Sequence, residues 1–131
     1  MATASDVEAY LRRLDRTFEK VGEDTFVVGL GPGQPPAVLK LSLPVLVAQV
    51  DVAEAPGNNP ALEAKLFRRL LELNATDLVY VAFGIEGSRI VIDAALELST
   101  LDLNELDGVL ANLDLALAEH VPHLRELVKR G

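Results

Sequence analysis

Residues 78–98, LVYVAFGIEGSRIVIDAALEL, decide the fold. The first part, Leu78 to Ile85, is apolar on both faces, whereas Arg89 to Leu98 alternates apolar and polar side chains as a half-buried strand does. The tight turn at Glu86-Gly87 leaves about two residues between the strands, and a turn of that length joins antiparallel neighbours. The sequence therefore predicts a hairpin in an antiparallel sheet.

The chain ahead of this hairpin reads as a helix, three strands and a second helix. The tetrapeptide Ser5-Asp6-Val7-Glu8 has the form of a capping box, which predicts a helix from Ser5, with an apolar stripe as far as Phe18 and a stop at Gly22. Asn59 and Pro60 have the residue types of a cap and a first helical position, and that helix should end near Asn74. The strands are expected at Thr25–Leu30, Ala37–Leu43 and Val45–Val52.

A long helix from about Leu103 to Val128 should close the chain. Its apolar positions are spaced three and four residues apart, which suits a helix packed along a sheet or another helix. They are Leu103, Leu106, Leu110, Leu113, Leu117, His120, Leu124 and Leu127. Pro122 lies inside this helix and is expected to kink or break it. We therefore expect one α+β domain over residues 1–131, in the order α-β-β-β-α-β-β-α, with a five-stranded antiparallel sheet.

Four stretches of the chain resemble a known family. They are Thr25–Leu30, Val45–Val52, Leu66–Asn74 and Leu101–Leu106. With the element order, the small size and the acidity, they make the chain similar to the type III secretion chaperone-like fold, and within it to the YbjN-like bacterial family. The resemblance implies an antiparallel sheet packed on helices, a homodimer, and a role in binding proteins rather than transforming substrates.

The composition limits the partners and the compartment. The 131 residues are half hydrophobic and carry a formal net charge of −8, which argues against nucleic acid and anionic membrane as direct partners. There is no cysteine, so disulfides, thiolate nucleophiles and cysteine-ligated zinc are excluded. The N-terminus lacks the features of a secretory signal, and the apolar runs are too short to span a membrane. We expect a cytoplasmic protein.

Patterns that suggest ligand sites are incomplete. The glycines Gly29, Gly31 and Gly33 precede prolines and a strand rather than a helix, so they indicate a hairpin loop and not a phosphate site. The acidic stretch from Asp102 places Leu106 where a calcium loop needs an oxygen ligand, so it does not predict a calcium site.

His120 and His123 are spaced to begin a metal site, but they lack a third ligand, and His120 falls on an apolar face. Asp51, Glu54 and Glu63 could gather near the end of the third strand, although a solvated turn explains them equally well. We therefore assign no catalytic, cofactor-binding or metal-binding residue, and no cofactor.

The sequence favours a non-enzymatic protein-binding module, such as a chaperone, adaptor or regulatory partner, that acts as a homodimer. The alternative is a domain that senses a small molecule in a cleft. An apolar strand face beside a broad apolar helix stripe, here Leu66, Phe67, Leu70 and Leu71, usually marks an interface. We expect Val79, Val81, Phe83 and Ile85 to share one strand face. The candidates for a protein-interaction or dimer surface are Leu66, Phe67, Leu70, Val79, Val81, Phe83 and Ile85.

Overall fold

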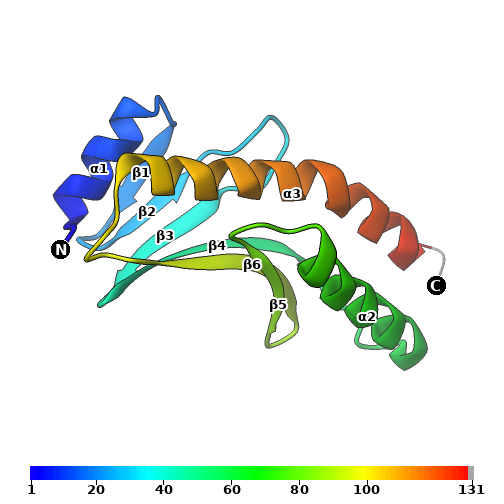
Figure 1. Ribbon diagram of the computed structural model, residues 1–131. Helices are drawn as coiled ribbons and strands as arrows, with labels where there is room; N and C mark the ends of the chain where they lie inside the picture. The colour runs from blue at the N-terminus through cyan, green and yellow to red at the C-terminus, as the bar shows by residue number, and fades with distance from the viewer. Residues whose placement is uncertain (130–131) are drawn as a thin grey trace.

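Three helices and six strands make up the computed structural model, which describes residues 1–129 (Figure 1). In chain order they are α1 (Ala4–Arg13), β1 (Phe18–Val21), β2 (Thr25–Val28), β3 (Ala37–Ser42), β4 (Val45–Glu54), α2 (Pro60–Thr76), β5 (Ala82–Glu86), β6 (Arg89–Glu97) and α3 (Leu103–Lys129). The strands form one sheet in the order β1-β2-β3-β4-β6-β5, and every neighbouring pair is antiparallel.

The hairpin that was read from residues 78–98 is present, with Glu86 paired to Arg89 across the turn. Gly87 occupies the left-handed region, with φ +60°, as a glycine can in so tight a turn. Because β6 also pairs with β4, this hairpin adds an edge to the first half of the sheet. Strands β1 and β5 therefore form its two outer edges.

The prediction of five strands was wrong, because the first helix is shorter than expected. Helix α1 ends at Arg13, Asp15 adopts φ +55°, and Phe18–Val21 pairs with β2 as a further strand. Phe18 fits the helical stripe and also fits this strand, where its ring meets Phe26 at a centroid distance of 6.1 Å. The observed order is α-β-β-β-β-α-β-β-α.

The predicted cap of α1 was also displaced by two residues. Thr3, not Ser5, is the cap, and its hydroxyl accepts a hydrogen bond from the backbone N–H of Asp6 at 3.3 Å. The Asp6 carboxylate in turn accepts from the backbone N–H of Thr3 at 2.8 Å. The cap of α2 is confirmed: the Asn59 side chain accepts from Leu62 N–H, and Pro60 is the first helical residue.

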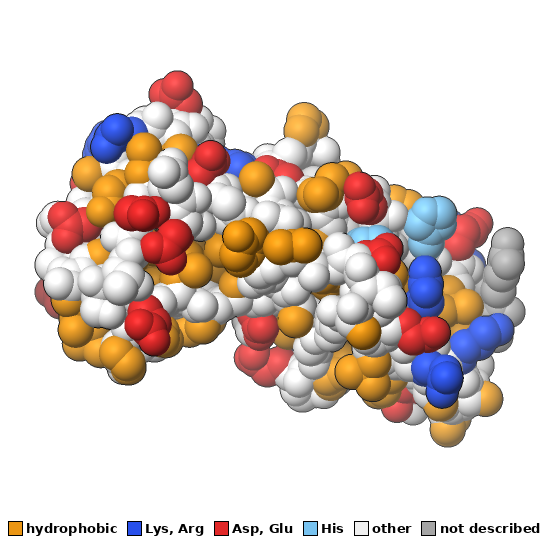
Figure 2. Space-filling view, viewed as in Figure 1, with side chains coloured by type: hydrophobic (Ala, Val, Ile, Leu, Met, Phe, Trp, Pro, Cys, Tyr) orange, Lys and Arg blue, Asp and Glu red, His pale blue; other side chains and the backbone are white. Residues whose placement is uncertain are grey.

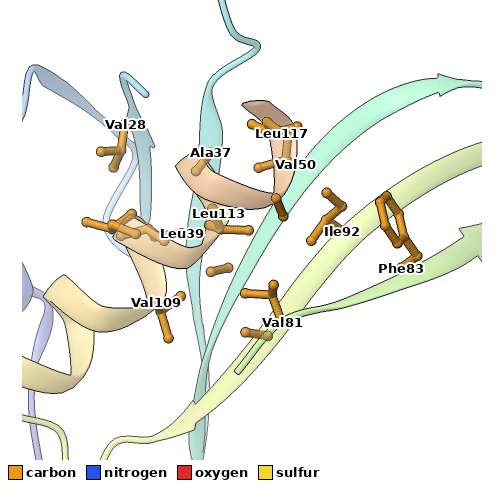
Figure 3. Packing of buried hydrophobic residues seen from close by; sticks show 14 of the residues in the cluster. Val28, Ala37, Leu39, Val50, Val81, Phe83, Ile92, Val109, Leu113 and Leu117 are labelled. Atoms are coloured by element: carbon orange, nitrogen blue, oxygen red, sulfur yellow. The ribbon is translucent and has the colours of Figure 1, made fainter. Parts of the chain in front are cut away.

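All three helices pack toward one face of the sheet, and α3 runs across it (Figure 1). Alternate strand residues such as Leu39, Val50 and Ile92 meet Leu113 and Leu117 of α3 in the core shown in Figure 3. The expected break at Pro122 is absent, since α3 continues to Lys129. Pro122 and Ala118 are both exposed, so water can reach the Ala118 carbonyl that a proline four residues later leaves without its helical partner.

Candidate protein-interaction surface

The fourth expected strand begins later than the sequence indicated. Residues 77–81 form an irregular connection, Tyr80 takes φ +67°, and β5 starts only at Ala82. A left-handed residue interrupts the alternation of strand side chains, so residues before and after it no longer share a face. The expected face of Val79, Val81, Phe83 and Ile85 is therefore not formed as one exposed strip.

The seven protein-interaction or dimer candidates are divided between core and surface. Four of them are buried within the chain: Leu66, Leu70, Val81 and Phe83. Phe67 is half-buried against the core, while Val79 and Ile85 are exposed. Phe83 and Ile85 both point to the helix side of the sheet, because their partners across the hairpin are the buried Ile92 and Ile90.

Helix α2 and strand β5 nevertheless form an apolar surface together. A depression of about 240 Å³ lies between them. Leu71 beside it is 69% exposed and Ile85 is 45% exposed, which is high for large apolar side chains. We call this the α2–β5 surface, lined by Phe67, Leu70, Leu71, Phe83, Gly84 and Ile85.

Leu71 belongs to the helical stripe seen in the sequence but was not among the candidates. Leu66 and Leu70 use the buried part of that stripe, and Leu71 lies at its outer margin. The signal was the width of the stripe, because Leu66, Phe67, Leu70 and Leu71 are more apolar residues than one packed helix face needs.

The outer edge of β5 is held by a side chain of α2. The Asn74 side-chain oxygen accepts a hydrogen bond from Phe83 N–H at 2.7 Å, and its amide nitrogen donates to the Phe83 carbonyl at 3.0 Å. Asn74 thus satisfies both backbone groups that a further strand would use at this position. A partner that binds the α2–β5 surface must use side-chain contacts at Phe83, not strand addition.

A second group of exposed apolar side chains lies elsewhere. Val79 and Leu115 line one small depression beside α3, and each is more than half exposed. Tyr80, in the same connection as Val79, is also exposed. Figure 2 shows hydrophobic side chains gathered between α3 and the segment that leads into β5. Val79 therefore belongs to a different surface from Ile85.

The glycine-rich segment is a hairpin loop, as the sequence indicated, because β2 and β3 on either side of it pair antiparallel. The Asp114 carboxylate of α3 accepts from Gly31 N–H at 2.8 Å and pairs with Arg16 at 3.0 Å. These contacts fix the loop onto α3. The Gly31 N–H is therefore already used within the chain.

The titratable residues singled out from the sequence are dispersed or paired. His120 is buried, with Nε2 3.8 Å from Glu119 and 4.0 Å from Asp77, while His123 is exposed. Asp51 pairs with Arg89 at 2.8 Å, and this hydrogen bond raises the pKa of Arg89. Over residues 1–129 no three His, Asp or Glu side chains are grouped as metal ligands.

In that same range no helix has the length and apolar character needed to cross a bilayer.

Comparisons with known proteins agree on the fold. The family model CesT_Tir_1 matches residues 1–130. No curated protein sequence matches the chain. Solved structures match it at low sequence identity, so they bear on the fold alone.

Three of these structures span most of the chain. A chain of the heterodimeric ExoU-SpcU complex, from the type III secretion system of Pseudomonas aeruginosa, has a TM-score of 0.68 at 18% identity, covering 88% of this chain and 95% of its own. The ExsC-ExsE complex gives 0.58 at 21% identity, with coverage of 91% and 92%. YbjN from E. coli gives 0.56 at 12% identity, with coverage of 81% and 79%.

The resemblance stated from the sequence is thereby confirmed, and the chain belongs to the CesT_Tir_1 family, a family of type III secretion chaperones whose fold it shares with YbjN.

Proposed function

We propose that this protein is a non-enzymatic protein-binding module that acts as a homodimer through the α2–β5 surface. Family membership supports the binding role, and solved structures with this fold include the ExoU-SpcU and ExsC-ExsE complexes. The observation that carries the homodimer is the pair Leu71 and Ile85, both exposed on one apolar surface of a chain with a net charge of −8.

A second copy of the chain suits this surface because a two-fold axis places an apolar patch against its own copy. Leu71 of one protomer can enter the depression between α2 and β5 of the other, so that the depression and the exposed leucine complete each other. Asn74 keeps the Phe83 backbone occupied, so at Phe83 the contact is made by side chains.

The homodimer is tested by analytical ultracentrifugation at tens of micromolar protein. We expect a dimer for the natural chain and a folded monomer for Leu71→Glu and for Ile85→Glu, because each buries a charge in the contact. The matched control is Leu115→Glu, which adds the same charge at a leucine that is 54% exposed on α3. A monomeric natural chain, or equal dissociation by Leu115→Glu, would count against the α2–β5 dimer.

Val81→Glu is not a suitable interface variant, although Val81 was a candidate from the sequence. Its side chain is buried among the core residues, so a carboxylate there should unfold the chain instead of separating two protomers. Circular dichroism distinguishes the two results, since a separated but folded monomer keeps its helical signal.

The binding role is tested by affinity purification from a bacterial lysate, with the natural chain and Leu71→Glu in parallel. We expect a protein that co-purifies reproducibly. The non-enzymatic part of the proposal predicts no turnover of generic esters and phosphates with added divalent metals. Reproducible turnover would contradict the non-enzymatic part of the proposal. A set of co-purifying proteins that changes between repeats would contradict the binding role.

A further inference from the structure

A second apolar cavity, of about 250 Å³, lies where the last turns of α3 pass beside α2, at the end of the molecule far from α1 (Figure 1). Buried side chains from three elements form its floor: Leu66, Ile90, Val121 and Leu124. Val52 and Ala53 of β4 and Val128 of α3 complete the apolar lining. We call this the α2–α3 cavity. Helix α2 contributes to both this cavity and the α2–β5 surface, but the two share no lining residue.

The backbone of β4 is shaped to form this cavity. The pairing of β4 with β6 shifts register between Asp51 and Ala53, so Val52 is an extra residue in the strand. In a regular strand neighbouring side chains point to opposite faces, whereas here Val52 and Ala53 both line the same cavity. Bulges of this kind are concentrated at sheet edges and beside functional sites.

The mouth of the cavity carries two cations. Arg125 and Lys129 lie one helical turn apart on α3, are exposed, and line the cavity with a single acid, Glu54. Within residues 1–129 neither cation has a carboxylate within 4.0 Å, in contrast to Arg16 and Arg89.

An apolar cavity with net positive charge at its mouth, in a chain of net charge −8, is complementary to an amphipathic anion. We propose that the α2–α3 cavity binds a straight-chain carboxylate of medium length. The alkyl chain lies against Leu66, Ile90 and Leu124, and the carboxylate lies between Arg125 and Lys129. Neighbouring carboxylate and guanidinium or ammonium groups form short, charge-assisted hydrogen bonds.

The volume sets the length of the ligand. A cavity of roughly 150 Å³ holds one benzene molecule, and clefts for drug-sized ligands begin at about 300 Å³. The 250 Å³ of the α2–α3 cavity therefore suits one alkyl chain such as that of octanoate or decanoate, and not a bulky ring system. Small-molecule sensing was the alternative left open by the sequence, and this cavity gives it a definite place that does not depend on the homodimer.

Isothermal titration calorimetry with hexanoate, octanoate and decanoate tests the proposal on the full chain. Each added methylene should tighten binding by about fourfold until the chain outgrows the cavity. Replacing both cations, by Arg125→Gln and Lys129→Gln, should weaken decanoate by about tenfold or more and leave the uncharged decanol unchanged. The matched control is Arg13→Gln with Lys40→Gln, two exposed cations elsewhere, which should leave decanoate binding unchanged.

Filling the cavity gives a second, independent test. Val128→Trp at the mouth and Ala53→Leu in the wall should each abolish decanoate binding while the circular dichroism spectrum stays that of the natural chain. Absence of saturable decanoate binding by the natural chain overturns the proposal. Equal weakening of decanoate and decanol by the two glutamine substitutions also overturns it, because the cations would then not recognise a carboxylate.

Discussion

At the scale of single residues, the pair Thr3 and Asp6 determines where the first helix begins. The carboxylate of Asp6 accepts the backbone N–H and the hydroxyl of Thr3, at 2.8 and 3.0 Å. The backbone hydrogen bond is the larger cause that lowers the pKa of Asp6 below 3.8, and the side-chain bond is the second. The cap is therefore a charge-dependent contact, and it gives a stability that varies with pH.

We predict that Asp6→Asn lowers the melting temperature at neutral pH but not in acid. Because the folded pKa of Asp6 is below its unfolded value, its stabilisation is complete above pH 3.8 and is lost as the pH falls through the folded pKa. The melting temperatures of the two chains should converge as the pH falls below 3.8. The control Asp107→Asn removes the same charge from an exposed site on α3. If the melting temperatures of the natural chain and Asp6→Asn still differ in acid, the charge of Asp6 is not the source of the stabilisation.

At the scale of elements, the sheet depends on contacts that join segments distant in sequence. The hairpin, the cap of α2 and the apolar face of α3 could be predicted because each rests on spacing within a short window. Strand β1 could not, since Phe18 satisfies a helical stripe and a strand equally, and only its pairing with Val28 decides between them. The start of β5 was missed for a similar reason. The left-handed conformation at Tyr80 is usually indicated in a sequence by glycine, and there is no glycine at this position.

For the candidate surface, the sequence indicated which helix carries it but not which of its residues are exposed. The element that carries it, α2, was recognised from the width of its apolar stripe. Which residues of the stripe face outward depends on where α2 lies against β5, and that is a tertiary contact. Hence Leu66 and Leu70 proved to be buried, and Leu71 proved to be exposed. The α2–α3 cavity left no periodic signal, because the bulge at Val52 lets two successive residues, Val52 and Ala53, line it together.

Asn74 joins α2 to β5 through its two hydrogen bonds with the Phe83 backbone. We predict that Asn74→Ala destabilises the chain by about 1–3 kcal/mol, since it leaves both Phe83 backbone groups without their partner. Urea unfolding followed by circular dichroism measures the loss. Thr76→Ala is the control, because its hydroxyl donates only to a carbonyl of its own helix. If Asn74→Ala lowers the free energy of unfolding no more than Thr76→Ala does, the prediction is wrong, and water replaces the Asn74 amide at the strand edge.

At the scale of the whole molecule, net charge opposes the proposed homodimer. Each protomer carries a formal charge of −8, so two protomers repel each other as they approach, and this repulsion adds to the free energy of association. The α2–β5 surface is apolar and gains its free energy from burial, which salt does not screen.

Dimerisation should therefore tighten as the salt concentration rises, because screening removes the repulsion and leaves the apolar contact. Sedimentation equilibrium in sodium chloride from about 0.01 to 0.15 M, where the Debye length falls from about 30 to 8 Å, measures the trend. Leu71→Glu should remain monomeric throughout, since it adds charge inside the contact as well as outside it. A dimer that weakens with salt would mean that ion pairs hold the protomers together, and the interface would then have to lie on a charged face and not between α2 and β5.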